Sequence, residues 1–237
     1  MFAVGQRSWQ VCSVMTRTAP PALALTAARL QPRSKSAIPS LFLVTDAIRL
    51  PNPDTAILAL PRGTRARYHP RFKAGVIVRE RDDAALEILA RRITPLCRAR
   101  GIAIIIANNI RLALKLGADG VHLSEDTARH GLLSPNRVLR RDRKHGLMVT
   151  VAVHSERALR RALSLNIDGA LIAPVFATKS HPNVSPIGAV RLASLINKTR
   201  RRYVPASLIA LGGVSPVTAQ RLIACGADGF AAIGALT

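Results

Sequence analysis

A four-residue pattern occurs three times, as Gly117-Ala118-Asp119-Gly120, Asn166-Ile167-Asp168-Gly169 and Gly226-Ala227-Asp228-Gly229. Each copy follows a helical pattern and precedes a short apolar run, so each indicates a turn from a helix into a strand. The three runs are the fourth, sixth and eighth candidate strands of the chain. Such turns before alternate strands favour a closed α/β (β/α)8 TIM barrel over an open doubly wound sheet, which more often carries GxGxxG after its first strand.

Eight β-rich apolar runs alternate with helical patterns, and this alternation implies parallel strands covered by helices. We expect strands at 41–45, 75–79, 102–106, 120–123, 147–153, 169–173, 208–211 and 229–233. Two helix starts are predicted by their caps, at Ser215-Pro216 and at Ser155. Gly226 is predicted to end the helix that begins after Ser215. The three repeated aspartates lie at the barrel end opposite the catalytic rim, so we interpret them as turn and capping residues.

Composition excludes several protein classes. Of 237 residues, 49% are hydrophobic, 3% aromatic and 20% charged, which excludes a disordered chain and predicts an aliphatic core. No apolar run approaches the length of a membrane span. The three cysteines are widely spaced and form no CxxC motif, so they support neither a disulfide framework nor a zinc site. We expect a cytoplasmic protein in a reducing compartment.

The chain is strongly basic, with 35 Lys and Arg against 13 Asp and Glu and a net charge of +22. Such a field favours phosphorylated ligands, nucleic acid or anionic membranes. The basic clusters at 62–73, 137–144 and 198–202 lack interleaved aromatic side chains that could stack on bases, which argues against nucleic acid. A solvated basic face is the structural alternative. We expect phosphorylated small molecules as partners and no membrane; association into a homo-oligomer stays open.

The first part of the chain differs from the rest. Residues 1–45 contain five basic residues and no Asp or Glu. We therefore divide the chain into an N-terminal extension, 1–40, and a TIM barrel domain, 41–237. The extension has three interpretations: an upstream start with Met15 as the true one, an Arg-rich targeting leader, or a helix over 22–30 that covers the barrel.

In a TIM barrel, functional residues follow the C-terminal ends of the strands. Here that rule selects the residues Arg79, Arg81, Asn108, Asn109, 124–127, His154, 174–182, Gly212, Gly213 and Gly234. Glycines after the last two strands allow backbone N–H groups to approach a phosphate, which is the usual anion site of this fold. A tight turn is the alternative explanation for Gly212-Gly213. The placement of both loops together favours a phosphate site.

These motifs resemble the thiamine phosphate synthases and their TenI-like thiazole tautomerase relatives. The similar segments are LFLVTD (41–46), GADGVHL (117–123), VHS (153–155), PVFATKSHP (174–182), LGG (211–213) and GADGFAAIGAL (226–236). The resemblance covers nearly all of the chain after the extension. It implies a transferase of thiamine biosynthesis, in which a hydroxymethylpyrimidine diphosphate loses pyrophosphate and a thiazole phosphate nitrogen captures the carbocation, with Mg²⁺ neutralising the departing charge.

The resemblance also assigns site residues. Arg79 matches the arginine of the family's QxRxK pyrophosphate motif, while Arg81 replaces its lysine and Ile77 its glutamine. Thr178 and Ser180 match the hydroxyls of the TxTK loop, and His181 replaces its lysine. The candidate catalytic residues are His154, Arg79 and Ser180. The candidate substrate-binding residues are Arg79, Arg81, Asn108, Thr178, Ser180, His181, Gly188, Gly212, Gly213, Ile233 and Gly234, the last replacing a serine of the thiazole-phosphate cradle.

The expected metal ligands are altered. The family's Asn-Asp pair after the third strand reads Ala107-Asn108, and its aspartate after the fourth reads Thr127. Magnesium prefers anionic oxygen, so an amide and a hydroxyl are poor substitutes. Glu125 or Asp126 could compensate. We therefore expect a degenerate Mg²⁺ site formed by Asp126, Glu125 and Thr127.

Histidines distinguish the remaining hypotheses. His154 matches the histidine of the tautomerase VHS segment, where an imidazole serves as acid and base. A synthase histidine at the same place, or a purely structural one, is the alternative. His122 lies inside the fourth strand and is predicted to be a packed barrel residue. A thiamine phosphate synthase is the leading hypothesis; a TenI-like tautomerase or divergent paralogue is second, and a non-catalytic binder of phosphate ligands or nucleic acid is third.

Overall fold

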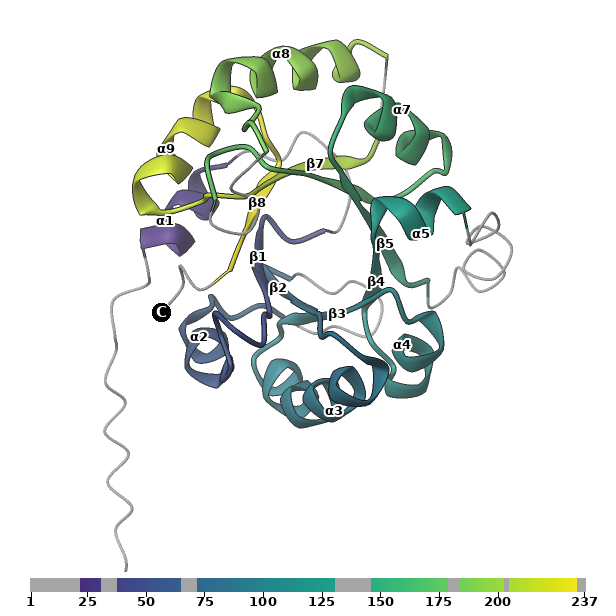
Figure 1. Ribbon diagram of the computed structural model, residues 1–237. Coiled ribbons are helices and arrows are strands. Elements are labelled where there is room, and N and C mark those ends of the chain that lie inside the picture. The colour runs from purple at the N-terminus through teal and green to yellow at the C-terminus, as the bar shows by residue number, and fades with distance from the viewer. Residues whose placement is uncertain are drawn as a thin grey trace, which may run out of the picture.

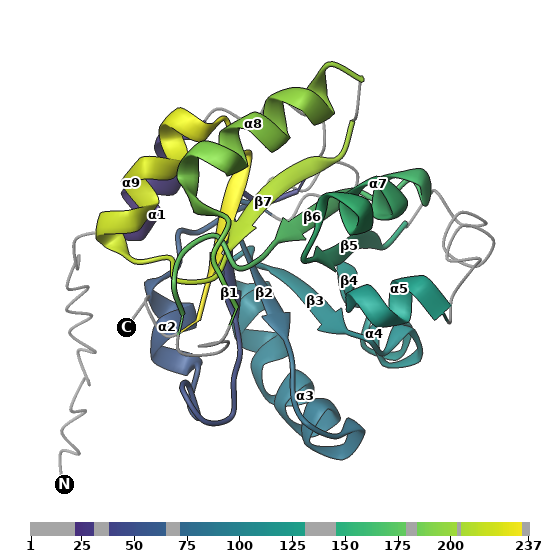
Figure 2. The ribbon, with the colours of Figure 1, turned by 45° about the horizontal axis from the view of Figure 1, so that its top comes forward.

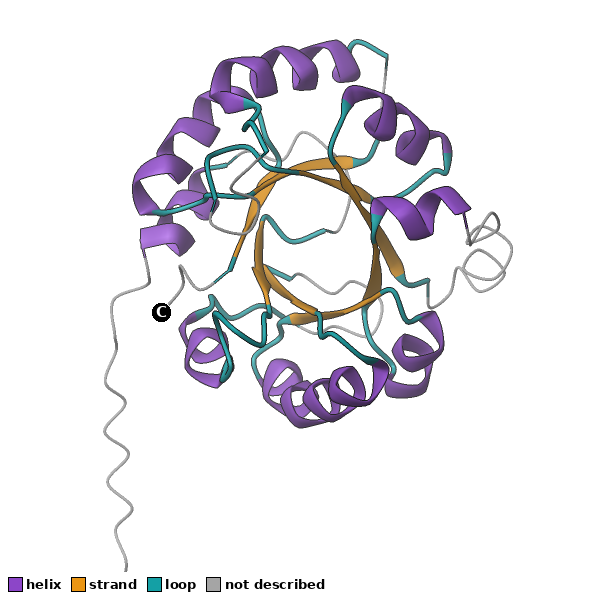
Figure 3. Ribbon diagram, in the orientation of Figure 1, coloured by secondary structure: helices purple, strands orange, loops and turns teal. Residues whose placement is uncertain are grey.

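The computed structural model describes residues 22–30, 38–64, 72–130, 146–178, 184–202 and 205–233. Ser180, His181 and Gly234, which sequence analysis placed in the site, lie outside these ranges. Within them, eight parallel strands form a closed barrel in chain order, from β1 next to β2 round to β8 next to β1 (Figures 1 and 3). The predicted TIM barrel is confirmed. The strands are β1 (Leu41–Val44), β2 (Ala74–Val78), β3 (Ala103–Ala107), β4 (Gly120–Leu123), β5 (Met148–Val153), β6 (Gly169–Ile172), β7 (Ser207–Leu211) and β8 (Gly229–Ala232).

Helices surround this barrel, as Figure 2 shows from an oblique angle. The described helices are α1 (Ala22–Arg29), α2 (Asp54–Ala59), α3 (Asp83–Ala99), α4 (Ile110–Leu116), α5 (Glu125–His130), α7 (Glu156–Ser164), α8 (Gly188–Arg200) and α9 (Pro216–Cys225). No described helix is long and apolar enough to cross a membrane. Side chains along the strands form two clusters: one set packs against the surrounding helices, and the other fills the barrel interior.

Aliphatic side chains and one phenylalanine fill the barrel interior. Phe42, Ile77, Ile105, Leu171 and Ile209 belong to this inner cluster and are fully buried. Phe42 lies directly opposite Gly75 in the β1–β2 register. A Cβ at Gly75 would lie 3.0 Å from the Phe42 ring, so the missing side chain leaves room for the aromatic one. The largely aliphatic barrel interior therefore accommodates the aromatic ring of Phe42.

The three repeated aspartates have one shared structural role. Asp119, Asp168 and Asp228 each directly precede an even-numbered strand. Each accepts a hydrogen bond through Oδ2 from a backbone N–H of the preceding strand: from Ile104 at 2.8 Å, from Val149 at 2.8 Å and from Leu208 at 2.7 Å, respectively. The carboxylates thus fasten adjacent strands at the end of the barrel away from the candidate site, as the turn interpretation predicts.

The predicted helix caps are present. Ser215 and Thr218 form a capping box at the start of α9, and Gly226 ends that helix at φ 74°. Ser155 accepts a hydrogen bond from the backbone N–H of Ala158 and caps α7. Because α7 and α9 begin directly after β5 and β7, these caps fix how the chain leaves two strands on the catalytic side.

Helix α1 occupies the segment for which sequence analysis considered a covering helix. It lies beside α9 in the ring of helices (Figure 1). Leu23, Ala24 and Ala27 are buried members of the main hydrophobic core. The helix is therefore part of the packed structure.

Candidate functional site

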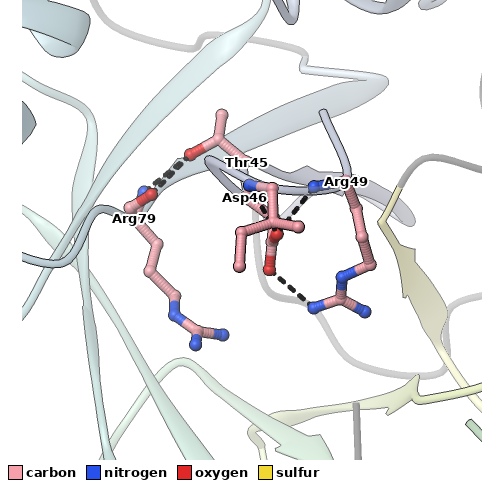
Figure 4. A network of polar contacts seen from close by, with 5 residues as sticks. Thr45, Asp46, Arg49 and Arg79 are labelled. Carbon is pink, nitrogen blue, oxygen red and sulfur yellow. Dashed lines mark hydrogen bonds and ion pairs between the residues drawn. The ribbon is translucent and has the colours of Figure 1, made fainter. Parts of the chain in front are cut away.

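Arg79 lies at the C-terminal end of β2 and is anchored through its backbone. The buried Thr45 hydroxyl accepts from the Arg79 N–H at 2.8 Å and donates to the Arg79 carbonyl at 3.0 Å (Figure 4). The Arg79 side chain is exposed, and its guanidinium forms no ion pair with any described residue. A permanently charged fork on a fixed backbone is suited to bind a diphosphate. Arg81, two residues later, is also exposed.

Asp46 lies between Arg79 and Arg49 in Figure 4. Its Oδ1 accepts from the backbone N–H groups of Ile48 and Arg49, and its Oδ2 lies 2.6 Å from Nη2 of Arg49. The Arg49 hydrogen bond is the main cause that lowers the Asp46 pKa to about 2. Sequence analysis did not identify the Asp46–Arg49 pair at the rim. Its sequence signal is an aspartate after the first strand followed three residues later by an arginine, with an Asx turn between them.

His122 lies in β4, and its Nδ1 is 2.9 Å from the Thr150 hydroxyl of β5. Burial, and secondarily the charge of Arg79, lower the His122 pKa to about 4. The imidazole is therefore neutral near pH 7 and adds no charge next to Arg79. This environment agrees with the prediction of a packed barrel histidine.

Asn108 and its neighbours form the connections after β3 and β4. Asn108 adopts φ 53°, and its Oδ1 accepts from the Ser124 N–H at 2.8 Å. Asn109 caps α4 by accepting from the Leu112 N–H. The Ser124 hydroxyl is 2.8 Å from the Thr127 hydroxyl and accepts from the Thr127 N–H at 3.1 Å, so Ser124, directly before α5, is bonded to the first turn of that helix. Asn108 is exposed and keeps its Nδ2 group unbonded within the described part of the chain.

The predicted magnesium ligands do not converge. Glu125 bonds to His154, Asp126 is 78% exposed and faces Arg129 at 3.8 Å, and the Thr127 hydroxyl is used by Ser124. Across residues 22–233, omitting the gaps in the description, no three His, Cys, Asp or Glu side chains are grouped as metal ligands. A hard cation requires several convergent oxygen ligands, and this donor set does not supply them. These residues therefore do not fit the Mg²⁺ that the resemblance implies.

His154 and Glu125 form a pair of ionisable groups where β4 and β5 end. Glu125 Oε2 lies 2.9 Å from His154 Nδ1 and 3.0 Å from the His154 backbone nitrogen. The His154 side chain is 50% exposed and that of Glu125 31% exposed. One carboxylate oxygen thus holds both the ring and the backbone of His154. Sequence analysis selected both residues but assigned Glu125 to a metal.

Gly212 and Gly213 follow β7, and both have positive φ, at 94° and 63°. A Cβ on Gly213 would lie 2.3 Å from the Ala177 carbonyl oxygen, and one on Gly212 would lie 2.8 Å from Pro174 Cα. The loop after β6 is bonded to this turn by Val175 N–H to Leu211 O at 2.8 Å and by Phe176 N–H to Gly212 O at 3.0 Å. Close packing of two loops therefore explains both glycines, in agreement with the tight-turn alternative.

This explanation leaves room for an anion. The backbone N–H groups of Gly213 and Val214 donate to no acceptor within the described residues. Ile233, at the end of β8, packs against the inner barrel cluster, so its side chain lies on the barrel's axis side. Thr178 is partly buried at the last described position of the loop after β6. Gly188 differs, because its N–H donates to the Val175 carbonyl at 2.9 Å and is not available to a ligand.

Comparison with known proteins agrees with this architecture. A family model described as thiamine monophosphate synthase matches residues 66–236, more than half of the chain. The chain belongs to this family. Thiamine-phosphate synthase from Bacillus velezensis is 30% identical over 150 residues, which cover 63% of this chain and 62% of the relative. The match to that relative thus spans less than two thirds of its length. The enzyme from Bordetella bronchiseptica is 32% identical over 155 residues, covering 62% of this chain and 66% of the relative.

A solved member of similar fold is thiamine phosphate pyrophosphorylase from Pyrococcus furiosus. It has a TM-score of 0.57 and 19% identity, and the alignment covers 82% of this chain and 85% of the other. At this identity the likeness supports the barrel fold alone. Family membership rests on the sequence match.

Proposed function

We propose that this family member is a thiamine phosphate synthase that joins hydroxymethylpyrimidine diphosphate to a thiazole phosphate and releases pyrophosphate. In this reaction the C–O bond to the diphosphate breaks, and the thiazole nitrogen forms a C–N bond with the resulting carbocation. The main supporting observation is Arg79 at the C-terminal rim of the barrel. Its backbone is bonded to Thr45, its guanidinium forms no ion pair with the described residues, and it lies within the segment that matches the family model. The substrates are phosphorylated small molecules, and we propose that the protein acts in the cytoplasm.

Arg79 is proposed to hold the diphosphate. Its guanidinium can donate two parallel hydrogen bonds to phosphate oxygens and stabilise the charge that develops on the leaving group. The two bonds from Thr45 fix the Arg79 backbone, so only the side chain must be ordered on binding. Because His122 is neutral near pH 7, it adds no positive charge to that of Arg79. Arg81 and Asn108 are proposed as further donors to the same group.

The turn after β7 is proposed to hold the thiazole phosphate. The N–H groups of Gly213 and Val214 face no acceptor in the described chain, and α9 begins two residues after Val214. Backbone N–H groups next to a helix N-terminus favour a phosphoryl group. Ile233 is proposed to contact the thiazole side of the same ligand.

An assay of product formation tests this function. Wild-type protein, supplied with both substrates, should form thiamine phosphate and pyrophosphate. Arg79→Ala should lower kcat/KM about 100-fold or more, the order expected for loss of a donor to developing charge. Arg92→Ala is the matched control, because Arg92 lies on α3 and pairs with Asp54 of α2. No product from wild type, with or without Mg²⁺, rejects the synthase; equal losses in both variants reject the role of Arg79.

A second candidate function is thiazole tautomerisation. The specific observation is the contact between His154 and Glu125. It places an imidazole on a rim where the described His, Cys, Asp and Glu side chains form no group of three metal ligands. Such a reaction needs a proton donor and acceptor and no metal. Conversion of a thiazole carboxylate phosphate tautomer that is lost in His154→Ala and unaffected by chelator supports this function. Conversion that persists in His154→Ala contradicts it.

A further inference from the structure

Glu125 contacts His154 in a way that determines how the imidazole is oriented. Glu125 is the first residue of α5, directly beyond β4, and His154 follows β5, the next strand of the barrel. The same oxygen, Oε2, accepts from the His154 backbone N–H at 3.0 Å and lies 2.9 Å from its Nδ1. Two contacts to one residue restrain both the position of the backbone and the rotation of the ring.

The chemistry of this contact selects a tautomer. An ionised carboxylate only accepts hydrogen bonds, so the Nδ1 atom beside it must carry a proton. In a neutral imidazole the other nitrogen, Nε2, then carries the lone pair. The His154 side chain is 50% exposed, so we expect a ligand at the rim to reach this nitrogen. The ring is thus prepared to accept a proton through Nε2.

We infer that Glu125 is a positioning residue that holds His154 in the Nδ1-protonated form for proton transfer through Nε2. The inference rests on the second candidate function, tautomerisation of a thiazole carboxylate phosphate. That reaction moves one proton between two atoms of the substrate, so His154 takes a proton at Nε2 and returns one, and no other reactant is consumed. Glu125 acts through His154 and does not contact the substrate.

This assignment explains why Glu125 does not serve as a metal ligand. Its bonded oxygen is already used twice, and Asp126, the neighbouring carboxylate, is directed toward Arg129 on the outside of α5. Glu156 offers a matched comparison. It follows His154 by two residues, but its carboxylate pairs with Lys198 at 2.6 Å and not with the imidazole.

The tautomer can be measured without any substrate. Long-range ¹⁵N–¹H correlation spectra of wild-type protein above pH 7 should report a protonated Nδ1 and an unprotonated Nε2 for His154, assigned by loss of the signals in His154→Gln. Glu125→Ala should shift the population toward protonated Nε2, Glu125→Gln should retain more of the original form because its amide oxygen still accepts, and Glu156→Ala should change nothing. A wild-type ring protonated on Nε2, or one unchanged in Glu125→Ala, overturns the inference.

Enzyme kinetics then test the positioning role of Glu125 separately from the tautomerase function. In an active wild-type tautomerase, Glu125→Ala should lower kcat about 10-fold or more with little change in KM, and Glu125→Gln should recover part of the loss. An unchanged kcat in folded Glu125→Ala overturns the positioning role. No tautomerisation by wild type rejects the second candidate function, while the spectra still decide whether Glu125 sets the tautomer.

Discussion

At the scale of single residues, local contacts determine which charged side chains at the rim are available to a ligand. Asp46 is held by Arg49, and desolvation, together with the charge of Arg79, lowers the His122 pKa so that its imidazole is neutral near pH 7. Arg79, in contrast, forms no ion pair with the described residues and remains available to an anion. Asp46, His122 and Arg79 therefore have three different roles, and of these three only Arg79 is suited to bind a phosphorylated ligand.

His122 makes stability depend on pH. Its pKa falls from the usual 6.5 to about 4 on folding, so between these pH values the unfolded chain binds a proton that the folded chain does not. The free energy of unfolding should therefore decrease as pH falls from about 6.5 to about 4, by up to about 3 kcal/mol. Urea denaturation across this range should show the decrease.

A variant isolates this contribution. His122→Asn lacks the titrating group, so its stability should change less between pH 6.5 and pH 4 than that of wild type. Thr150, which contacts the ring, is retained in both proteins. The same pH dependence in both would show that His122 is not the source.

Single residues also mark where sequence analysis succeeded and failed. Arg79 and His154 could be selected because the C-terminal end of a strand fixes which residues reach the rim. The partner of Glu125 could not be predicted, because it depends on how α5 turns its first residue relative to β5. Gly188 was named only among the substrate-binding residues that the resemblance implies, and its N–H donates to the Val175 carbonyl inside the protein.

At the scale of elements, the aspartate turns connect strand pairs, and Asp228 is the most deeply buried of the three aspartates. It is 3% exposed, accepts from Leu208 N–H and lies 2.6 Å from Nη2 of Arg200 on α8. The turn therefore joins β7, β8 and α8. This role was predictable from the repeated sequence, whereas the arginine partner, 28 residues earlier in the chain, was not.

Removal of that carboxylate should be costly. Asp228→Ala leaves Arg200 without its buried partner and the Leu208 N–H without its side-chain acceptor, so it should lower the free energy of unfolding by about 3 kcal/mol or more. Asp54→Ala breaks an exposed bond between α2 and α3 and should cost about 1 kcal/mol or less. Denaturant unfolding of both variants measures the difference. Similar small losses would contradict a structural role for Asp228.

At the scale of the whole molecule, the closed barrel with α1 beside α9 brings the rim loops into one region. Closure could be predicted because eight apolar runs alternate with helical patterns and a similar turn precedes the fourth, sixth and eighth of them. The degenerate metal site expected from Glu125, Asp126 and Thr127 stays a prediction that the contacts of these side chains do not support, because residue identity and position do not determine where side chains point. The division at residue 40 stays a prediction, although α1 shares the hydrophobic core with the barrel.

The contribution of α1 can be measured by two leucine substitutions on the same helix. Leu23 is 1% exposed and Leu25 is 55% exposed. Leu23→Ala should destabilise the protein by about 2–4 kcal/mol through lost burial and a cavity. Leu25→Ala should cost about 0.5 kcal/mol or less. Equal effects would show that α1 is not packed on the barrel in solution.

The central claim is that the carboxyl ends of the barrel strands bind a phosphorylated thiazole next to the turn after β7. The most direct test is an amide ¹H–¹⁵N titration with thiazole phosphate. We predict saturable chemical-shift changes that are largest for Gly213, Val214 and Ile233 and that are lost in Gly213→Ala. Gly226→Ala is the matched control and should retain them. It also replaces a positive-φ glycine, but a Cβ there has a single neighbouring atom within 4 Å, at 3.8 Å. Largest shifts on the opposite end of the barrel, or no saturable shifts, would contradict the claim.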